Sequence, residues 1–127
     1  MKKLMSVLFA AACLFGATHL QAQTAPKSVI HVVTVAWKKD ATPAQIEAAL
    51  AGVQALPKSY KGITRVWTKT HKIQNAKGVE LPRTHAFVME FVDEAALKDY
   101  TGSDAQKEWY KVYIPIRESS TTFDITN

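Results

Sequence analysis

Two histidines and one tyrosine are the side chains in this sequence that could carry acid/base chemistry on a small molecule. His31 lies within residues 28–37 and His85 within residues 84–92, and most of their neighbours are apolar. Desolvation would keep both imidazoles neutral near pH 7, where each can donate and accept a hydrogen bond. Tyr100 adds a hydroxyl that could act as an acid or hold a ligand. Both histidines also fit a plainer role as hydrogen-bonded core residues, so binding and packing stay open.

The amide of Gln106 could hold a polar group of a ligand, but it cannot abstract a proton near neutral pH. Residues 103–106 (Ser-Asp-Ala-Gln) also form a capping-box pattern, which explains Gln106 without a ligand. Trp67 and Trp109 are expected in the core or in the wall of a cavity. No catalytic residue is assigned. The candidate ligand-binding residues are His31, His85, Tyr100, Trp67 and Gln106.

Other kinds of chemistry lack their sequence signatures. A metal site needs three or four convergent ligands, and the sequence has neither HExxH nor a comparable acidic–histidine spacing. No glycine-rich phosphate loop and no Gly-x-Ser-x-Gly elbow occur. We therefore expect no metal and no cofactor, and we leave open whether the protein is an enzyme.

Four strands would position the candidate residues. Residues 28–37 and 84–92 are rich in β-branched and apolar side chains, which predicts two strands with apolar groups on both faces. Alternation at 62–71 predicts the second strand along the chain, between these two, with Ile63 and Trp67 on the same side, and residues 118–126 predict the fourth. Residues 72–82 predict a long loop.

Helices are expected between these strands. The Thr-Pro-Ala-Gln pattern at 42–45 predicts a capped helix start, and Pro57 is expected to end that helix. Asp93 predicts the cap of a short helix through Tyr100. Gly102 can end it in a left-handed conformation, before the helix that starts at residue 103.

The order β-α-β-β-α-β predicts a ferredoxin-like α+β fold, a four-stranded antiparallel sheet with the helices on one face. The first and third strands are neighbours in this topology, so His31 and His85 could lie on the same face and near each other. The opposite face would stay bare and apolar in a monomer. A second copy related by a twofold axis would cover it, giving a homodimeric α/β barrel around an interior cavity.

The N-terminus has the pattern of a secretory signal peptide at residues 1–22. Two lysines precede a short apolar run, and small polar residues lead to a predicted cleavage site after Ala22. The run is too short to span a bilayer, so we expect no membrane anchor after cleavage and a periplasmic or secreted protein. Processing as a lipoprotein at Cys13 is the alternative. Cys13 is the single cysteine, so the mature chain cannot form an internal disulfide.

Length and composition fit one globular domain, predicted at residues 28–126. The chain has 127 residues, of which 47% are hydrophobic and 21% charged. Removing Lys2 and Lys3 with the leader lowers the formal charge from +5 to +3. The remaining lysines are scattered and do not alternate with aromatic residues, so nucleic acid is not an expected partner.

Four segments in register give the chain a resemblance to the stress-responsive A/B barrel (Dabb) family of dimeric α/β barrels. They are residues 30–33 (Ile-His-Val-Val), 55–63 (Ala-Leu-Pro to Gly-Ile), 84–91 (Thr-His-Ala-Phe-Val-Met-Glu-Phe), and Tyr100 with residues 107–110. The resemblance implies a homodimer with an interior cavity and diverse activities. In the plant polyketide cyclases of this family, acid/base chemistry uses a tyrosine and a histidine in the cavity.

Position by position, the cyclase tyrosine falls on Tyr100 and the strand histidines fall on His31 and His85, whereas the histidine base falls on Gln106. Loss of the base favours a homodimer that binds a small hydrophobic or aromatic molecule without a defined activity. The alternative is a cofactor-independent enzyme of the cyclase, isomerase or monooxygenase type, in which His31 or His85 takes over proton transfer. A third alternative is an interaction scaffold.

Overall fold

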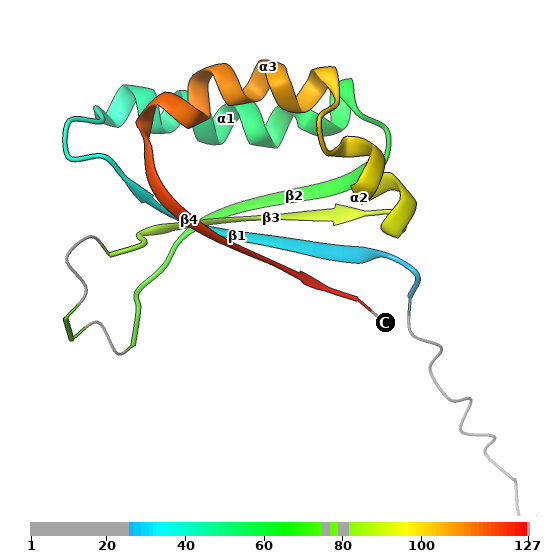
Figure 1. Ribbon diagram of the computed structural model, residues 1–127, viewed down its shortest axis with the longest axis horizontal. Coiled ribbons are helices and arrows are strands. Elements are labelled where there is room, and N and C mark those ends of the chain that lie inside the picture. Colours follow the sequence, from blue (N-terminus) through cyan, green and yellow to red (C-terminus); the bar gives the residue numbers. More distant parts are fainter. Residues whose placement is uncertain (1–25, 75–76, 79–81, 127) are drawn as a thin grey trace, which may run out of the picture.

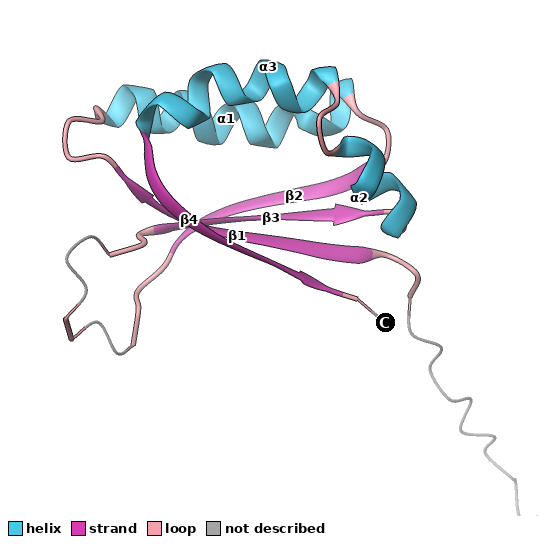
Figure 2. Cartoon of the chain, viewed as in Figure 1, coloured by secondary structure: helices cyan, strands magenta, loops and turns pink. Residues whose placement is uncertain are grey.

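A four-stranded antiparallel sheet lies under a layer of helices (Figures 1 and 2). The computed structural model describes residues 26–74, 77–78 and 82–126, so the predicted signal peptide at 1–22 lies outside the described residues, as does part of the predicted loop at 72–82. The strand order is β2-β3-β1-β4. This arrangement confirms the predicted ferredoxin-like α+β fold. The strands are β1 (Val29–Trp37), β2 (Ile63–Thr70), β3 (His85–Phe91) and β4 (Arg117–Ile125).

The helices begin at the predicted caps. They are α1 (Pro43–Ser59), α2 (Glu94–Tyr100) and α3 (Asp104–Tyr113), followed by a 3₁₀ helix at Ile114–Ile116. At the start of α1 the backbone N–H of Gln45 donates to the Thr42 hydroxyl, while the Thr42 N–H donates to the Gln45 side chain. These two bonds complete the predicted capping box.

The sequence predicts that Pro57 ends α1, but this prediction is wrong. It lies inside the last turn, and the helix continues to Ser59. A proline removes one backbone donor, but the fixed φ of its ring still fits a helix, so the last turn can be completed by the two residues that follow. The Tyr60 N–H then closes the helix by donating to the Leu56 carbonyl at 2.8 Å.

A short junction between α2 and α3 sets the direction of Gln106. Gly102 adopts a left-handed φ of +81°, as predicted from its position after α2. The Ser103 hydroxyl accepts from the Gln106 N–H, which is one half of the predicted capping box. The other half differs, because the side-chain oxygen of Gln106 accepts from the Gly102 N–H at 2.7 Å.

An irregularity in β2 decides which side chains face the helices. The register with β3 shifts between Ile63 and Arg65, so Ile63 faces the helices whereas Arg65 and Trp67 face the opposite side. One extra residue in a strand reverses the side-chain alternation beyond it. The prediction that Ile63 and Trp67 share a side of the sheet is therefore wrong. The prediction that Trp67 lies in the core or in a cavity wall is also wrong for the single chain. Trp67 is 40% exposed.

Both faces of the sheet carry apolar residues. The face under the helices is buried and carries Val29, Val33, Val35, Trp37, Phe87, Met89 and Phe91. The opposite side, here named the outer sheet face, carries Ile30, Val32, Trp67, Val88, Phe123 and Ile125. Three of these six residues are strongly exposed: Trp67 at 40%, Phe123 at 49% and Ile125 at 56%.

Candidate functional site: a cavity under α3

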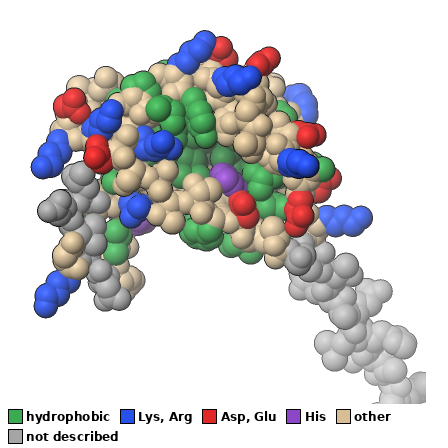
Figure 3. Space-filling view, in the orientation of Figure 1, with side chains coloured by type: hydrophobic (Ala, Val, Ile, Leu, Met, Phe, Trp, Pro, Cys, Tyr) green, Lys and Arg blue, Asp and Glu red, His purple; other side chains and the backbone are tan. Residues whose placement is uncertain are grey.

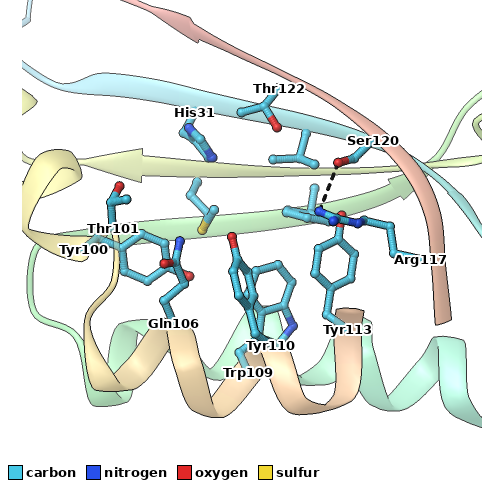
Figure 4. A pocket seen from close by; sticks show the side chains of 13 residues that line it. His31, Tyr100, Thr101, Gln106, Trp109, Tyr110, Tyr113, Arg117, Ser120 and Thr122 are labelled. Atoms are coloured by element: carbon cyan, nitrogen blue, oxygen red, sulfur yellow. Dashed lines mark hydrogen bonds between the residues drawn. The ribbon is translucent and has the colours of Figure 1, made fainter. Parts of the chain in front are cut away.

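A cavity of about 200 Å³ lies between the helical layer and the sheet. Figure 3 shows the hollow from one side, with hydrophobic and histidine side chains inside it. Side chains from β1, β3 and β4 form its floor and those from α2 and α3 its roof (Figure 4). The lining residues are His31, Val33, Phe87, Met89, Tyr100, Thr101, Gln106, Trp109, Tyr110, Tyr113, Arg117, Ser120 and Thr122.

Aromatic rings give the cavity a rigid apolar wall. Trp109 stacks on Tyr113 with ring centroids 4.5 Å apart and an angle of 8° between the planes. Phe87 meets both rings edge-on, at 5.2 and 5.6 Å. The indole N–H of Trp109 donates to the Ala49 carbonyl of α1 at 2.9 Å, so its polar atom is satisfied away from the cavity. An aromatic ligand can therefore pack against fixed ring edges and faces.

Two tyrosine hydroxyls are buried in the cavity without a hydrogen-bond partner among the described residues, those of Tyr100 and Tyr113. Tyr100 is 1% exposed and Tyr113 is 2% exposed. Burial raises the pKa of both hydroxyls; for Tyr113 the nearby Ser120 hydroxyl and Arg117 guanidinium partly oppose the effect. Both groups therefore stay protonated at neutral pH and can donate a hydrogen bond to a ligand.

His31 forms a close pair with a carboxylate at one end of the cavity. Its Nδ1 lies 2.6 Å from the Asp124 Oδ1, across the β1–β4 pairing. Phe91 meets the imidazole edge-on at 6.0 Å. Figure 4 shows the ring pointing into the cavity. When ionised Asp124 accepts the Nδ1 proton, Nε2 becomes the ring nitrogen with a lone pair, which is the form a general base needs.

Arg117 brings a positive charge into the cavity. Its guanidinium donates to the Ser120 hydroxyl at 3.4 Å and lies over the Tyr113 ring at 5.4 Å (Figure 4). The β1–β4 register places Arg117 and Asp124 at opposite ends of the strand, beside Trp37 and His31 respectively. The cavity is therefore polar along β4 and aromatic along α3 and β3.

Gln106 lines the cavity but has a structural task as well. Its side-chain oxygen is engaged by the Gly102 N–H, so its NH₂ group is the part left for a ligand. An amide NH₂ can only donate. The structure thus places Gln106 as a donor near Tyr100 and Thr101, with no base at this position (Figure 4).

His85 does not line this cavity. It shares the helix-facing side of the sheet with His31, as predicted, but the two imidazoles do not lie near each other. His31 pairs with Met89 and His85 with Val35, an offset of four residues or about 13 Å along β1. His85 borders a separate groove beside α1. The alternation of side chains in a strand predicts which face of the sheet a residue lies on, but it does not predict how far apart two residues lie along the strands.

A hydrogen bond from the core holds His85 in place. The indole N–H of Trp37 donates to Nδ1 of His85 at 2.9 Å, and the Thr84 hydroxyl lies 2.9 Å from the same nitrogen. Burial lowers the pKa of His85, and the nearby His71 lowers it further. The imidazole therefore acts as a neutral acceptor for the core tryptophan.

Sequence reasoning missed several polar residues of the cavity. They are Tyr110, Tyr113, Arg117, Ser120 and Thr122, together with Asp124, which contacts the lining residue His31. A signal was present, since positions 120, 122 and 124 are polar while 123 and 125 are apolar. Such a strand is usually read with its apolar side toward the core. Here the apolar side belongs to the outer sheet face, so the polar side faces the cavity.

Two features are missing from the part of the chain that the structure describes. No three histidine, cysteine, aspartate or glutamate side chains in that part of the chain come together as a metal site. None of the helices described is both long and apolar enough to cross a bilayer. The polar groups of the cavity are hydroxyls, one amide, one guanidinium and the His31–Asp124 pair.

Comparisons with known proteins agree with this fold. The family model described as the stress responsive A/B barrel domain (Dabb) matches residues 29–127. No curated protein matches the chain. The most similar solved structures are 13–20% identical to the chain, so each shows the fold alone.

Three of these structures illustrate the range. A hydroxynitrile lyase from Passiflora edulis is 19% identical, with 81% of this chain and 95% of that chain covered and a TM-score of 0.68. A dimeric ferredoxin-like protein of unknown function from Thermobifida fusca is 15% identical, with coverage of 80% and 92% and a TM-score of 0.64. A cofactor-independent oxygenase from Streptomyces nogalater is 13% identical, with coverage of 80% and 93% and a TM-score of 0.61.

Proposed function

Because the chain belongs to the stress responsive A/B barrel domain (Dabb) family, we propose that it is an exported homodimer that binds a small aromatic molecule in the cavity of each protomer. The observation that carries the binding proposal is the pair of buried, unpartnered hydroxyls of Tyr100 and Tyr113. A buried hydroxyl without a partner costs about 1–3 kcal/mol. A ligand with acceptor groups would remove that cost.

The size and walls of the cavity support an aromatic occupant. An apolar cavity of about 150 Å³ holds benzene in another protein, and this cavity measures about 200 Å³. A single ring with small substituents therefore fits. Phe87, Trp109 and Tyr113 would surround it with ring edges and faces, the arrangement that aromatic pairs prefer.

The homodimer is supported by the outer sheet face. Trp67, Phe123 and Ile125 expose large apolar areas beside the partly buried Ile30, Val32 and Val88. A contiguous apolar face on a soluble protein favours association. The Thermobifida fusca protein of the same fold is described as dimeric.

Calorimetric titration with phenol tests binding in the cavity. We expect saturable binding of one phenol per protomer by the parent, and clearly weaker binding by the double variant Tyr100→Phe/Tyr113→Phe. Tyr60→Phe is the matched control, because the Tyr60 hydroxyl donates to the Ala96 carbonyl at 2.6 Å, away from the cavity. Equal phenol affinity in parent and double variant would refute the role of the two hydroxyls.

Export is tested by the mature N-terminus. We expect N-terminal sequencing of the protein from the producing cells to begin at Gln23, directly after the predicted cleavage site. A protein that begins at Met1, or at a lipid-modified Cys13, would contradict this part of the proposal.

A second candidate function, a cofactor-independent enzyme, is favoured by the His31–Asp124 pair. A carboxylate at 2.6 Å fixes the imidazole so that Nε2 can accept a proton within the cavity. Tyr100, at the same end of the cavity as His31, could then donate a hydrogen bond to the oxyanion that forms when a carbon next to a carbonyl loses its proton. Gln106 contributes no base to this scheme.

Proton exchange on a simple ketone tests the enzyme hypothesis. We expect the parent to accelerate exchange of the methyl protons of acetophenone with heavy water, followed by NMR. His31→Asn should reduce the accelerated rate about 100-fold, in the range that a general base supplies. The variant His85→Gln, outside the cavity, should retain the rate. A parent that gives no acceleration, or His31→Asn at the parental rate, would contradict catalysis by His31.

A further inference from the structure

Arg117 is a cation in the cavity with no carboxylate partner among the described residues. Ion pairs of the described residues join Arg65 to Glu90, Lys107 to Asp104 and Lys111 to Glu108, and none includes Arg117. Its contacts are the weak bond to Ser120 at 3.4 Å and the ring of Tyr113. Yet the guanidinium lies half-buried along the cavity wall (Figure 4).

Two hydroxyl groups lie near the Arg117 guanidinium. The Tyr113 hydroxyl is buried and makes no hydrogen bond of standard geometry among the described residues, but Ser120 and Arg117 lie close enough that both lower its pKa. The hydroxyl of Ser120, directly contacted by Arg117, also lines the cavity. A planar guanidinium beside two hydroxyls is a set of donors that matches the two oxygens of a carboxylate.

We propose that the ligand of the cavity is a small aromatic carboxylate whose carboxylate is bound by Arg117, the Tyr113 hydroxyl and Ser120. This inference rests on the proposed binding function and adds the chemical class of the ligand. A single cation compensates a single negative charge, so a monoanionic carboxylate is matched, whereas a phosphate dianion would leave one charge uncompensated in a partly buried site. The ring would lie against Phe87 and Trp109.

The residues at the other end of the cavity determine how the ligand is oriented. Asp124 lies there with His31, and its carboxylate would repel a second anion. Tyr100 and the NH₂ of Gln106 are donors at that end. The ligand would therefore place its carboxylate at Arg117 and a neutral acceptor group, such as a hydroxyl or carbonyl oxygen, near His31 and Tyr100.

A comparison of benzoate with benzamide tests the charge requirement directly. The two probes have nearly the same shape and differ in charge at the group that would meet Arg117. By calorimetry at about 0.15 M salt, where exposed charges are screened, we expect the parent to bind benzoate about tenfold or more tighter than benzamide. Arg117→Gln should lose about tenfold or more in benzoate affinity and change benzamide affinity little.

Lys111→Gln is the matched control, since it removes one positive charge from the exposed side of α3, where Lys111 pairs with Glu108 at 2.6 Å. It should leave both affinities unchanged. The inference is overturned if the parent binds benzamide as tightly as benzoate, or if a folded Arg117→Gln keeps its affinity for benzoate. If the parent binds phenol and benzamide but not benzoate, only the carboxylate inference fails. If it binds none of the three, the proposed binding function fails as well.

Discussion

Buried hydroxyls without partners are rare in folded proteins, and the cavity holds two of them, on Tyr100 and Tyr113. The Tyr100 ring packs against Phe91 and Tyr60, and the Tyr113 hydroxyl lies near Ser120 and Arg117. Their presence lowers the stability of the ligand-free chain. A side chain that costs stability in the absence of ligand is expected where binding, and not packing, determines the residue type.

The stability cost of Tyr100 can be measured. Tyr100→Phe should raise the free energy of unfolding of the ligand-free protein by about 1 kcal/mol, because it removes a buried donor that has no partner. Tyr60→Phe should lower it by about 1 kcal/mol, because it removes a formed hydrogen bond to Ala96. Urea unfolding curves give both values. A clear loss of stability in Tyr100→Phe would show that the hydroxyl has a partner.

His85 should make stability depend on pH. Its pKa in the folded state is lowered from 6.5, so the unfolded chain binds the proton more tightly than the folded chain. The free energy of unfolding should therefore fall as the pH drops through about 6.5, and it should recover as the pH rises. Protonation of Nδ1 would also break the bond from Trp37.

The comparison of the parent with His85→Gln isolates this effect, since glutamine offers an oxygen to Trp37 but does not titrate. Urea unfolding between about pH 5 and pH 8 should show a steeper loss of stability at low pH in the parent than in His85→Gln. Parallel curves would contradict the lowered pKa of His85.

At the scale of elements, the sequence identified the strands and helix starts because their signals are local. The caps Thr42, Asp93 and Ser103 accept the backbone N–H groups that their positions predicted. The alternation in β1 and β3 placed His31 and His85 on the correct side of the sheet. Such features depend on residues only a few positions apart.

The features that could not be predicted depend on contacts between distant segments. The extra residue in β2 is defined by its pairing with β3, and it alone moves Trp67 to the outer sheet face. The place of Asp124 next to His31 depends on the β1–β4 register. A cavity whose polar floor comes from β4 and whose roof comes from α3 is visible only when the register of the sheet is known.

Gly52 of α1 lies in close contact with Trp109 of α3, which lines the cavity. A β-carbon at this position would lie 2.8 Å from Cδ1 of Trp109. An alanine in a helix is normally favoured over glycine by about 1 kcal/mol. Here the rigid, buried indole would have to move, and overpacking costs about 1–3 kcal/mol. The clash should outweigh the gain in helix propensity.

We therefore expect Gly52→Ala to lower the free energy of unfolding and to weaken phenol binding, because Trp109 is part of the cavity wall. Thermal unfolding and calorimetry measure the two effects. The exposed neighbour Ala51, changed to glycine, gives the size of the propensity term alone. Gly52→Ala with raised stability would contradict the close contact.

For the whole molecule, the unusual distribution of polarity in β4 connects association with binding. Phe123 and Ile125 lie on the outer sheet face, while Ser120, Thr122 and Asp124 lie on the side of the cavity. If a second chain covers the outer sheet face, Phe123 and Ile125 are buried there, while Ser120, Thr122 and Asp124 stay on the side of the cavity. The strand then fulfils both roles without an exposed apolar surface.

Association through this face should be sensitive to a charge at its exposed aromatic residue. We expect the mature parent to sediment as a dimer at micromolar concentration and Phe123→Asp to sediment as a monomer, because the carboxylate would be buried against apolar side chains. Val112→Asp is the control, as Val112 is an exposed residue of α3 away from the sheet. A monomeric parent would contradict the proposed dimer.

The amide and indole signals that shift on binding show where a small aromatic molecule lies in the protein. In ¹H–¹⁵N NMR spectra of the mature protein titrated with phenol, the largest shift changes should fall on residues that line the cavity, including Tyr100, Gln106 and the indole N–H of Trp109. Saturation at those positions is the predicted result. Changes confined to the outer sheet face around Trp67 and Phe123, or no saturable changes at all, would show that phenol does not bind in the cavity.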